Sequence, residues 1–160
     1  MIIKRIKDLR KKFNKFKIDG YVIPKNDEFF SEYSEKNRLK FISNFSGSAG
    51  FAIILKNKNY LFVDSRYTIQ AELESSKYFK IVDFQKIINC KLFKNYTLGI
   101  DPKLFTSSQI IKFFNKHNKV KKINDNLIDN SFNKYSQSSE QFFSLSKNVD
   151  GESHVDKISK

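Results

Sequence analysis

The sequence is poor in several residue types: its 160 residues include one cysteine, two prolines, five glycines and no tryptophan. A single cysteine, Cys90, cannot form an internal disulfide, which excludes a disulfide-stapled secreted domain and suggests a reducing, cytoplasmic setting. Its apolar, lysine-flanked surroundings favour a packed thiol over a catalytic one. The scarcity of proline and glycine excludes collagen-like and low-complexity chains.

Long hydrophobic runs are also missing. No apolar run approaches the roughly 18 residues that a membrane-spanning helix needs. The N-terminus is basic but never develops the apolar core of a signal peptide. We therefore expect no membrane partner.

Positive charge and phenylalanine are abundant, with a net charge of +13 and 17 phenylalanines. The charge would suit nucleic acid or an anionic membrane. However, arginine, the preferred residue for bidentate phosphate and base contacts, occurs only at Arg5, Arg10, Arg38 and Arg66. The lysine, asparagine, isoleucine and phenylalanine enrichment is typical of an A+T-rich genome. We expect no specific nucleic-acid partner, only nonspecific binding at low salt.

Hydrophobic spacing predicts alternating helices and strands. Apolar residues of the first segment recur every three or four positions, at Ile2, Ile3, Ile6, Leu9, Phe13 and Phe16. This pattern predicts a core-facing helix with a basic solvent side, ended by Asp19-Gly20; a membrane-surface helix is the alternative. Further helices are predicted from about Ser65 and over Thr106–Lys116, with helical turns within 27–40 and near the end of 126–132. Strands are predicted at Tyr21–Pro24, Phe51–Leu55, Tyr60–Val63, 79–84, Leu98–Asp101 and 120–125.

The order of these elements indicates an α/β domain with a mixed β-sheet flanked by helices. A hairpin turn over 56–59 requires one antiparallel pair, so the sheet is not purely parallel. Residues 133–140 have a linker composition. We therefore divide the chain into an α/β domain at 1–132 and, at 133–160, a linker with the truncated start of a second domain.

The stretch FSGSAGF, residues 45–51, is the first candidate site. It lacks the GK[ST] of a P-loop and the GxGxxG of a dinucleotide fold, so a phosphate cradle is disfavoured. It also misses the GxSxG spacing of a nucleophile elbow. Neither His117 nor His154 is placed as a base for Ser46 or Ser48. The residues alone thus favour a binding or structural module without a catalytic constellation.

Metal-ligand patterns are equally weak. HExxH, CxxC and EF-hand spacings are all missing from the sequence. Asp64 and Asp101 each follow a predicted strand, which is a slight hint of a metal-dependent nuclease. Capping of the following turn, with Asp64 paired to Arg66, is favoured instead.

The segment from Ser31 to Glu74, SEYSEKNRLKFISNFSGSAGFAIILKNKNYLFVDSRYTIQAELE, resembles the N-terminal domain of Xaa-Pro aminopeptidases (aminopeptidase P). The resemblance continues through LGIDPKLFT, NDNLIDNSF and VDGESHVDKIS, in order, and spans nearly the whole chain. The matching positions include Arg38, Asp64, Arg66 and Tyr67, together with Gly47-Ser48-Ala49-Gly50. Four positions depart from the family pattern: Asn44 and Ser65 replace glycines, Phe62 replaces tryptophan, and Phe29 replaces a common histidine.

The resemblance implies a creatinase-like, ribonuclease-H-like N-terminal domain without catalytic or metal-binding residues of its own. It implies a full-length, homodimeric enzyme that removes the residue preceding proline. Two divalent metals, usually manganese, would lie in a C-terminal catalytic domain. This N-terminal domain would contribute to subunit assembly and wall the active-site cleft. The loop of Phe45, Ser46, Gly47, Ser48 and Gly50 is then a candidate substrate-path or interface loop, with Phe45 as its most exposed contact and the serines bonded to nearby backbone.

Three interpretations remain open at this stage. The chain is a non-catalytic domain of an Xaa-Pro aminopeptidase, a free-standing binding or regulatory module derived from that domain, or a weak nonspecific nucleic-acid binder.

Overall fold

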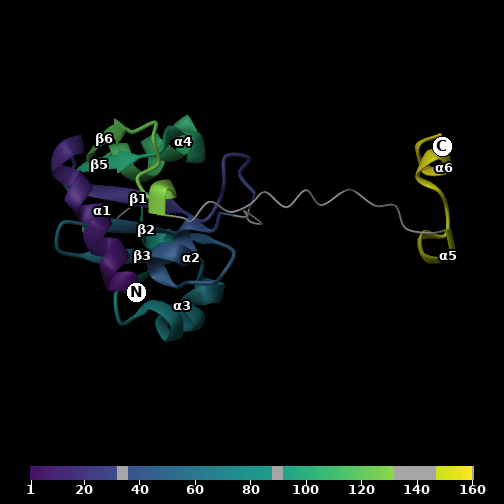
Figure 1. Cartoon of the computed structure of the whole chain (residues 1–160), viewed down its shortest axis with the longest axis horizontal. Helices are drawn as coiled ribbons and strands as arrows, with labels where there is room; N and C mark the ends of the chain where they lie inside the picture. The colour runs from purple at the N-terminus through teal and green to yellow at the C-terminus, as the bar shows by residue number, and fades with distance from the viewer. Residues whose placement is uncertain (32–35, 88–91, 132–146, 160) are drawn as a thin grey trace.

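A computed structural model of the chain describes residues 1–31, 36–87, 92–131 and 147–159. Its centre is a six-stranded sheet in the order β4-β3-β2-β1-β5-β6 (Figure 1). The strands are β1 (Gly20–Pro24), β2 (Gly50–Leu55), β3 (Asn59–Val63), β4 (Lys80–Asp83), β5 (Thr97–Ile100) and β6 (Lys119–Lys122). The α-helices are α1 (Ile2–Phe16), α2 (Arg38–Ser43), α3 (Thr68–Ser75), α4 (Ser107–Gln109), α5 (Lys147–Asp150) and α6 (His154–Ile158).

The sheet is mixed, as predicted. β2 pairs antiparallel with both β1 and β3, and the turn between β2 and β3 is the predicted hairpin at 56–59. β4 adds to β3 in parallel, while β5 and β6 extend the other side of β1 in parallel. The parallel pairs need crossover connections, which α3 provides between β3 and β4 and α4 with its continuation provides between β5 and β6.

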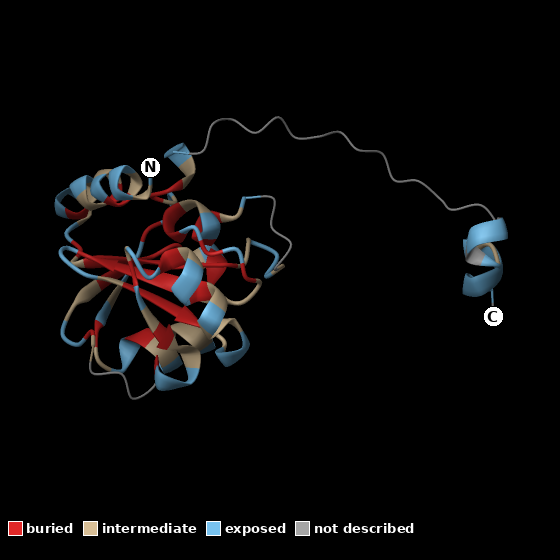
Figure 2. Cartoon of the chain, turned by 90° about the horizontal axis from the view of Figure 1, so that it is seen from below, coloured by how far each residue is buried: buried red, intermediate tan, exposed pale blue. Residues whose placement is uncertain are grey.

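Successive side chains of the central strands point to opposite faces of the sheet and pack into two separate hydrophobic cores. Tyr21 and Ile23 of β1 join the core beneath α1, α2 and α3, whereas Val22 joins the core on the opposite face. β2 and β3 alternate in the same way, because successive side chains of a strand point to opposite faces. Figure 2 shows the buried strands (red) between the helical layer near the N-terminus and the helical turns on the other side.

Helix α1 confirms its predicted apolar face in part. Ile6, Leu9 and Phe13 are buried, but Ile3 is 51% exposed. The predicted end at Asp19-Gly20 is wrong: the last helical residue is Phe16, and Lys17 caps the helix in a left-handed conformation with φ 49°. The amide of Ile18 donates to the carbonyl of Phe13, which closes the last turn in the way usual for a left-handed cap.

The helix predicted over Thr106–Lys116 is confirmed, although its hydrogen bonding was not foreseen. Thr106 and Gln109 form a reciprocal capping box at its start. After the three residues of α4, the helix continues as a π-helix over Ile110–Asn115. The wider turn is a type that often marks functional sites.

Some sequence predictions fall outside the described residues. These are the packed thiol of Cys90, the linker over 133–140, and most of the SEY motif of the resemblance. The boundary between 132 and 133 therefore stays a prediction. Among the described residues, no helix is both long and apolar enough to cross a membrane.

Candidate functional site

The glycine-serine loop connects α2 to β2 and packs around the buried ring of Phe45. Phe45 is 0% exposed, so the prediction that it is the most exposed contact of the loop is wrong. Its ring packs edge-on to Tyr67, with centroids 6.0 Å apart. A Cβ atom on Gly47 would lie 2.3 Å from this ring. The ring thus occupies the space that a side chain at Gly47 would need, and the loop folds inward over it.

Gly50 permits a second close approach at the start of β2. A Cβ atom there would lie 2.6 Å from the carbonyl oxygen of Phe62 on the neighbouring strand. Real Cβ atoms do not approach an oxygen so closely, so glycine is needed for the pairing of β2 with β3.

The sequence predicts that the two serines of the loop hydrogen-bond to nearby backbone groups. In the structure, their hydroxyl groups hydrogen-bond to side chains instead. Glu74 of α3 accepts hydrogen bonds from the Ser46 amide and the Ser46 hydroxyl, both at 2.7 Å. The Gln70 side-chain amide donates to both Ser46 Oγ and Glu74. Ser48 Oγ lies 2.8 Å from the Tyr67 hydroxyl. Burial alone would raise the pKa of Glu74, but the hydrogen bonds from Ser46 and Gln70 outweigh it and lower that pKa.

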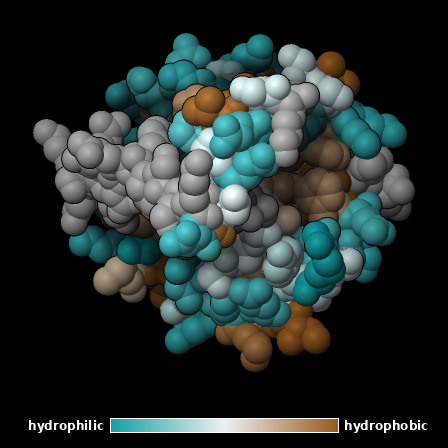
Figure 3. Space-filling model, turned by 90° about the vertical axis from the view of Figure 1, so that its right-hand side faces the viewer, coloured by the Kyte–Doolittle hydropathy of each residue, from teal (hydrophilic) through white to brown (hydrophobic). Residues whose placement is uncertain are grey.

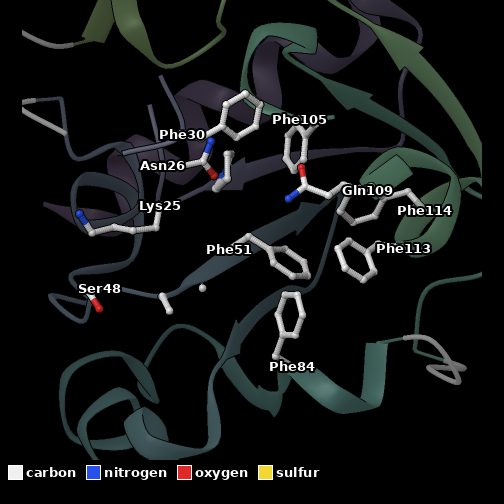
Figure 4. Close-up of a pocket in the computed structure, with 13 residues that line it drawn as sticks. Lys25, Asn26, Phe30, Ser48, Phe51, Phe84, Phe105, Gln109, Phe113 and Phe114 are labelled. Atoms are coloured by element: carbon white, nitrogen blue, oxygen red, sulfur yellow. The ribbon is translucent and has the colours of Figure 1, made fainter. Parts of the chain in front are cut away.

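A pocket of about 260 Å³ opens beside this loop, between the end of β1 and the π-helical segment (Figure 4). Its apolar lining includes six phenylalanines: Phe30, Phe51, Phe84, Phe105, Phe113 and Phe114. Its polar lining includes Lys25, Asn26, Ser48 and Gln109. Figure 3, a view from the side on which the loop after β1 lies, shows hydrophobic groups (brown) recessed among hydrophilic ones (teal).

The pocket wall is a connected set of aromatic contacts. Phe51 stacks on Phe62 at 4.8 Å and meets Phe84 and Phe114 edge-on at 5.6 and 5.7 Å. Phe113 lies edge-on to Phe84 at 5.3 Å. Offset and edge-on contacts are the favourable arrangements for aromatic rings, so the pocket is preformed. Sequence reasoning missed it; the only signal was the abundance of phenylalanine.

Arg38, expected only as a signature position, is the centre of a buried charge cluster. Its side chain is 1% exposed and forms ion pairs with Asp129 at 2.6 Å and Glu28 at 2.7 Å. Burial alone would lower the pKa of Arg38, but the two carboxylates more than compensate and raise it. The cluster joins the loop after β1, helix α2 and the turn at Asp129–Ser131.

Asp64, Arg66 and Asp101, also singled out in the sequence, make contacts within their own turns. Asp64 caps the 3-10 turn Ser65–Tyr67 by accepting from the Arg66 amide, and it pairs with the Arg66 guanidinium at 2.8 Å. Asp101 caps the turn Pro102–Leu104 in the same way. Both capping predictions are confirmed. Within the described ranges, no group of three His, Cys, Asp or Glu side chains is placed to hold a metal ion.

Together, the mixed sheet, the inward-folded glycine loop and the buried arginine cluster define an α/β domain with an aromatic pocket beside the end of β1. A family model described as the creatinase/prolidase N-terminal domain matches residues 5–150. The chain belongs to this family.

Relatives with longer chains share this domain. The "Probable Xaa-Pro aminopeptidase P" of Laccaria bicolor is 32% identical over 170 residues, covering 96% of this chain and 26% of the relative. The Xaa-Pro aminopeptidase 2 of Rattus norvegicus is 30% identical over 171 residues, covering 97% and 25%. The chain therefore spans about a quarter of the length of these relatives.

Solved structures agree on the fold. An X-prolyl aminopeptidase from Caenorhabditis elegans, a cytosolic enzyme with a di-nuclear active site, superposes with a TM-score of 0.70 at 24% identity, covering 81% of this chain and 25% of that one. The N-terminal creatinase/prolidase-like domain of a Corynebacterium diphtheriae metallopeptidase gives a TM-score of 0.59 at 14% identity, covering 76% and 95%.

Proposed function

We propose that this chain acts as the non-catalytic N-terminal domain of an Xaa-Pro aminopeptidase. The observation that carries the proposal is a family match over residues 5–150 in a chain that spans a quarter of its named relatives. The full enzyme would remove the N-terminal residue that precedes a proline. Its two divalent metals, which we expect to be manganese, would activate water in a C-terminal catalytic region.

The described residues do not fit such a metal pair, since they place no group of three potential ligands together. We therefore assign this chain no step of the hydrolysis. The cytosolic worm relative and the single cysteine support a cytoplasmic location.

The domain's contribution would be to wall the active-site cleft and to take part in assembly of a homodimer. The 45–50 loop and the aromatic pocket support this role, because they place backbone and apolar surface at the same end of the sheet, next to the loop after β1. In this arrangement the loop's Ser48 and Gly50 would face the path of the peptide, while Phe45 would support them from within.

Two experiments test the proposal. The reading frame beyond codon 160 should continue into a region that carries two Asp, one His and two Glu metal ligands. A stop codon immediately after Lys160 would instead favour the free-standing binding module. Removal of residues 1–132 from the longer enzyme should then lower the number of subunits per particle, obtained by dividing the light-scattering mass by the mass of the shortened subunit. It should also increase cleavage of long or folded Xaa-Pro substrates relative to tripeptides. An unchanged number of subunits and unchanged size selectivity would contradict the assembly and cleft-wall roles.

A further inference from the structure

We infer that the aromatic pocket is a peptide-binding site that takes one apolar residue together with its backbone amide group. The inference deepens the proposed function and rests on it only in the choice of peptide as the ligand class. Two features support this inference. The first is a preformed apolar cavity. The second is the pair of side-chain amides of Asn26 and Gln109 at its edge, each of which keeps one hydrogen-bonding group available for a ligand.

Asn26 offers an acceptor. Its Nδ2 group donates to the backbone carbonyls of Asp27, at 3.1 Å, and Leu104, at 3.0 Å. These two bonds fix the orientation of the amide, because only the nitrogen can donate. The Oδ1 atom accepts no hydrogen bond from the described residues and is free to accept an N–H from a ligand.

Gln109 offers the complementary donor. Its Oε1 atom accepts from the Thr106 backbone amide at 2.9 Å as part of the capping box. This bond fixes the orientation of the second amide and leaves Nε2 without an acceptor in the described part of the chain. Figure 4 shows Asn26 and Gln109 on opposite sides of the cavity, with their amide ends pointing toward one another. An acceptor and a donor that converge in this way match the N–H and C=O groups of a peptide backbone.

The cavity between them suits one apolar side chain. Its volume of about 260 Å³ exceeds the ~150 Å³ that holds a benzene molecule and is just below the ~300 Å³ at which drug-sized sites begin. The phenyl groups of Phe51, Phe84 and Phe113 border it. Burial of an aliphatic or aromatic side chain against them would supply most of the binding free energy.

A cationic ligand is the competing class, because aromatic cages often bind quaternary ammonium groups. The charges of the lining argue against it. None of the described lining residues is Asp or Glu, and Lys25 is the one charged residue among them. In Figure 4 the Lys25 side chain extends away from the phenyl groups. A neutral, amide-bearing apolar ligand therefore fits the pocket better than a cation.

The test is an NMR titration of the ¹⁵N-labelled 160-residue chain with small blocked amino acids. N-acetyl-L-leucine N-methylamide should cause saturable shifts of the Gln109 side-chain amide and of backbone signals around the pocket, with a dissociation constant of about millimolar magnitude. N-acetylglycine N-methylamide lacks the apolar group and should cause none.

A matched pair of variants isolates the Gln109 donor. Gln109→Glu keeps the oxygen that the capping box requires but replaces the Nε2 donor with a second acceptor, so binding of the leucine probe should weaken at least about 5-fold. Gln85→Glu makes the same charge change at an exposed position outside the lining and should leave binding unchanged. The dispersion of each variant's amide spectrum reports that it is folded.

Four results would overturn the inference: no saturable shifts at the pocket up to the solubility of the leucine probe, equal binding of the glycine probe, equal binding by Gln109→Glu, or tighter binding of tetramethylammonium. Each result is independent of peptide cleavage. A domain that fails to bind the probe therefore leaves the proposed non-catalytic role standing.

Discussion

Arg38 and Asp129, which lie 91 positions apart in the sequence, form a bidentate ion pair: Nε donates to Oδ1 at 2.6 Å and Nη2 donates to Oδ2 at 2.8 Å. The pair fastens the turn Asp129–Ser131 to helix α2. Arg38 is 0% exposed, so its charge depends on Asp129 and Glu28 for compensation.

Removal of one carboxylate from this cluster should destabilise the fold. Asp129→Asn leaves a fully buried guanidinium with only Glu28 to balance it. We expect the free energy of unfolding in urea to fall by about 2–4 kcal/mol, less than for a fully buried pair because both carboxylates are partly exposed. Asp8→Asn, which removes the exposed helical pair with Lys11, is the control and should leave the urea midpoint unchanged. Equal midpoints for the two variants would show that the buried cluster contributes nothing to stability.

The packing of Phe45 over Gly47 gives a second prediction. Gly47→Ala would force a methyl group into the Phe45 ring, and we expect it to lower the free energy of unfolding by about 1–3 kcal/mol. Phe45→Leu makes room at the same place. The double variant should therefore lose less stability than the sum of the two single variants in urea unfolding. Additive losses would mean that the ring and the glycine do not share the space.

The carboxylate of Glu74 should make the free energy of unfolding depend on pH in the acid range. Its pKa is lower in the folded chain than the ordinary value of 4.5, so the unfolded chain binds the proton more tightly. Its contribution is therefore present above about pH 4.5 and is lost as the pH falls through the folded pKa. We expect Glu74→Gln to flatten the decline of stability below that pH, measured by urea unfolding at a series of pH values. Glu72→Gln, an exposed change on the same helix, is the control; the same flattening in both variants would refute the assignment.

The capping box at Thr106 should stabilise the helix that carries Gln109. Thr106→Ala removes the hydroxyl that accepts from the Gln109 amide at 3.2 Å, and we expect a loss of about 1 kcal/mol. Thr106→Ser keeps that hydroxyl and should retain most of the stability. If thermal unfolding shows equal losses for the two variants, the box does not support this helix.

Most of the fold could be predicted because its signals are local. Two apolar runs, Phe51–Leu55 and Tyr60–Val63, separated by the polar residues 56–59 predict a hairpin. The spacing of Ile6, Leu9 and Phe13 predicts a helix. Each pattern is read within a few residues. The end of α1 differs from the prediction because glycine is the usual residue of a left-handed cap, which favours Asp19-Gly20, whereas Lys17 adopts that conformation.

The candidate site was less predictable because its contacts are distant in sequence. Nothing near Arg38 indicates Asp129 as its partner, because the resemblance marks Arg38 but includes Asp129 only within the stretch NDNLIDNSF. The resemblance implies an exposed Phe45 on a substrate-path loop, but its ring turns inward into the space that the missing side chain of Gly47 leaves open. The available groups of Asn26 and Gln109 depend on two separate hydrogen-bond networks, which only coordinates reveal.

The central claim, that this domain belongs to an aminopeptidase without performing its chemistry, is tested most directly by a cleavage assay. The 160-residue chain, incubated with Mn²⁺ and a set of Xaa-Pro peptides, should release no N-terminal residue detectable by mass spectrometry, while a full-length Xaa-Pro aminopeptidase under the same conditions should release it. Metal-dependent release by the chain alone would contradict the account.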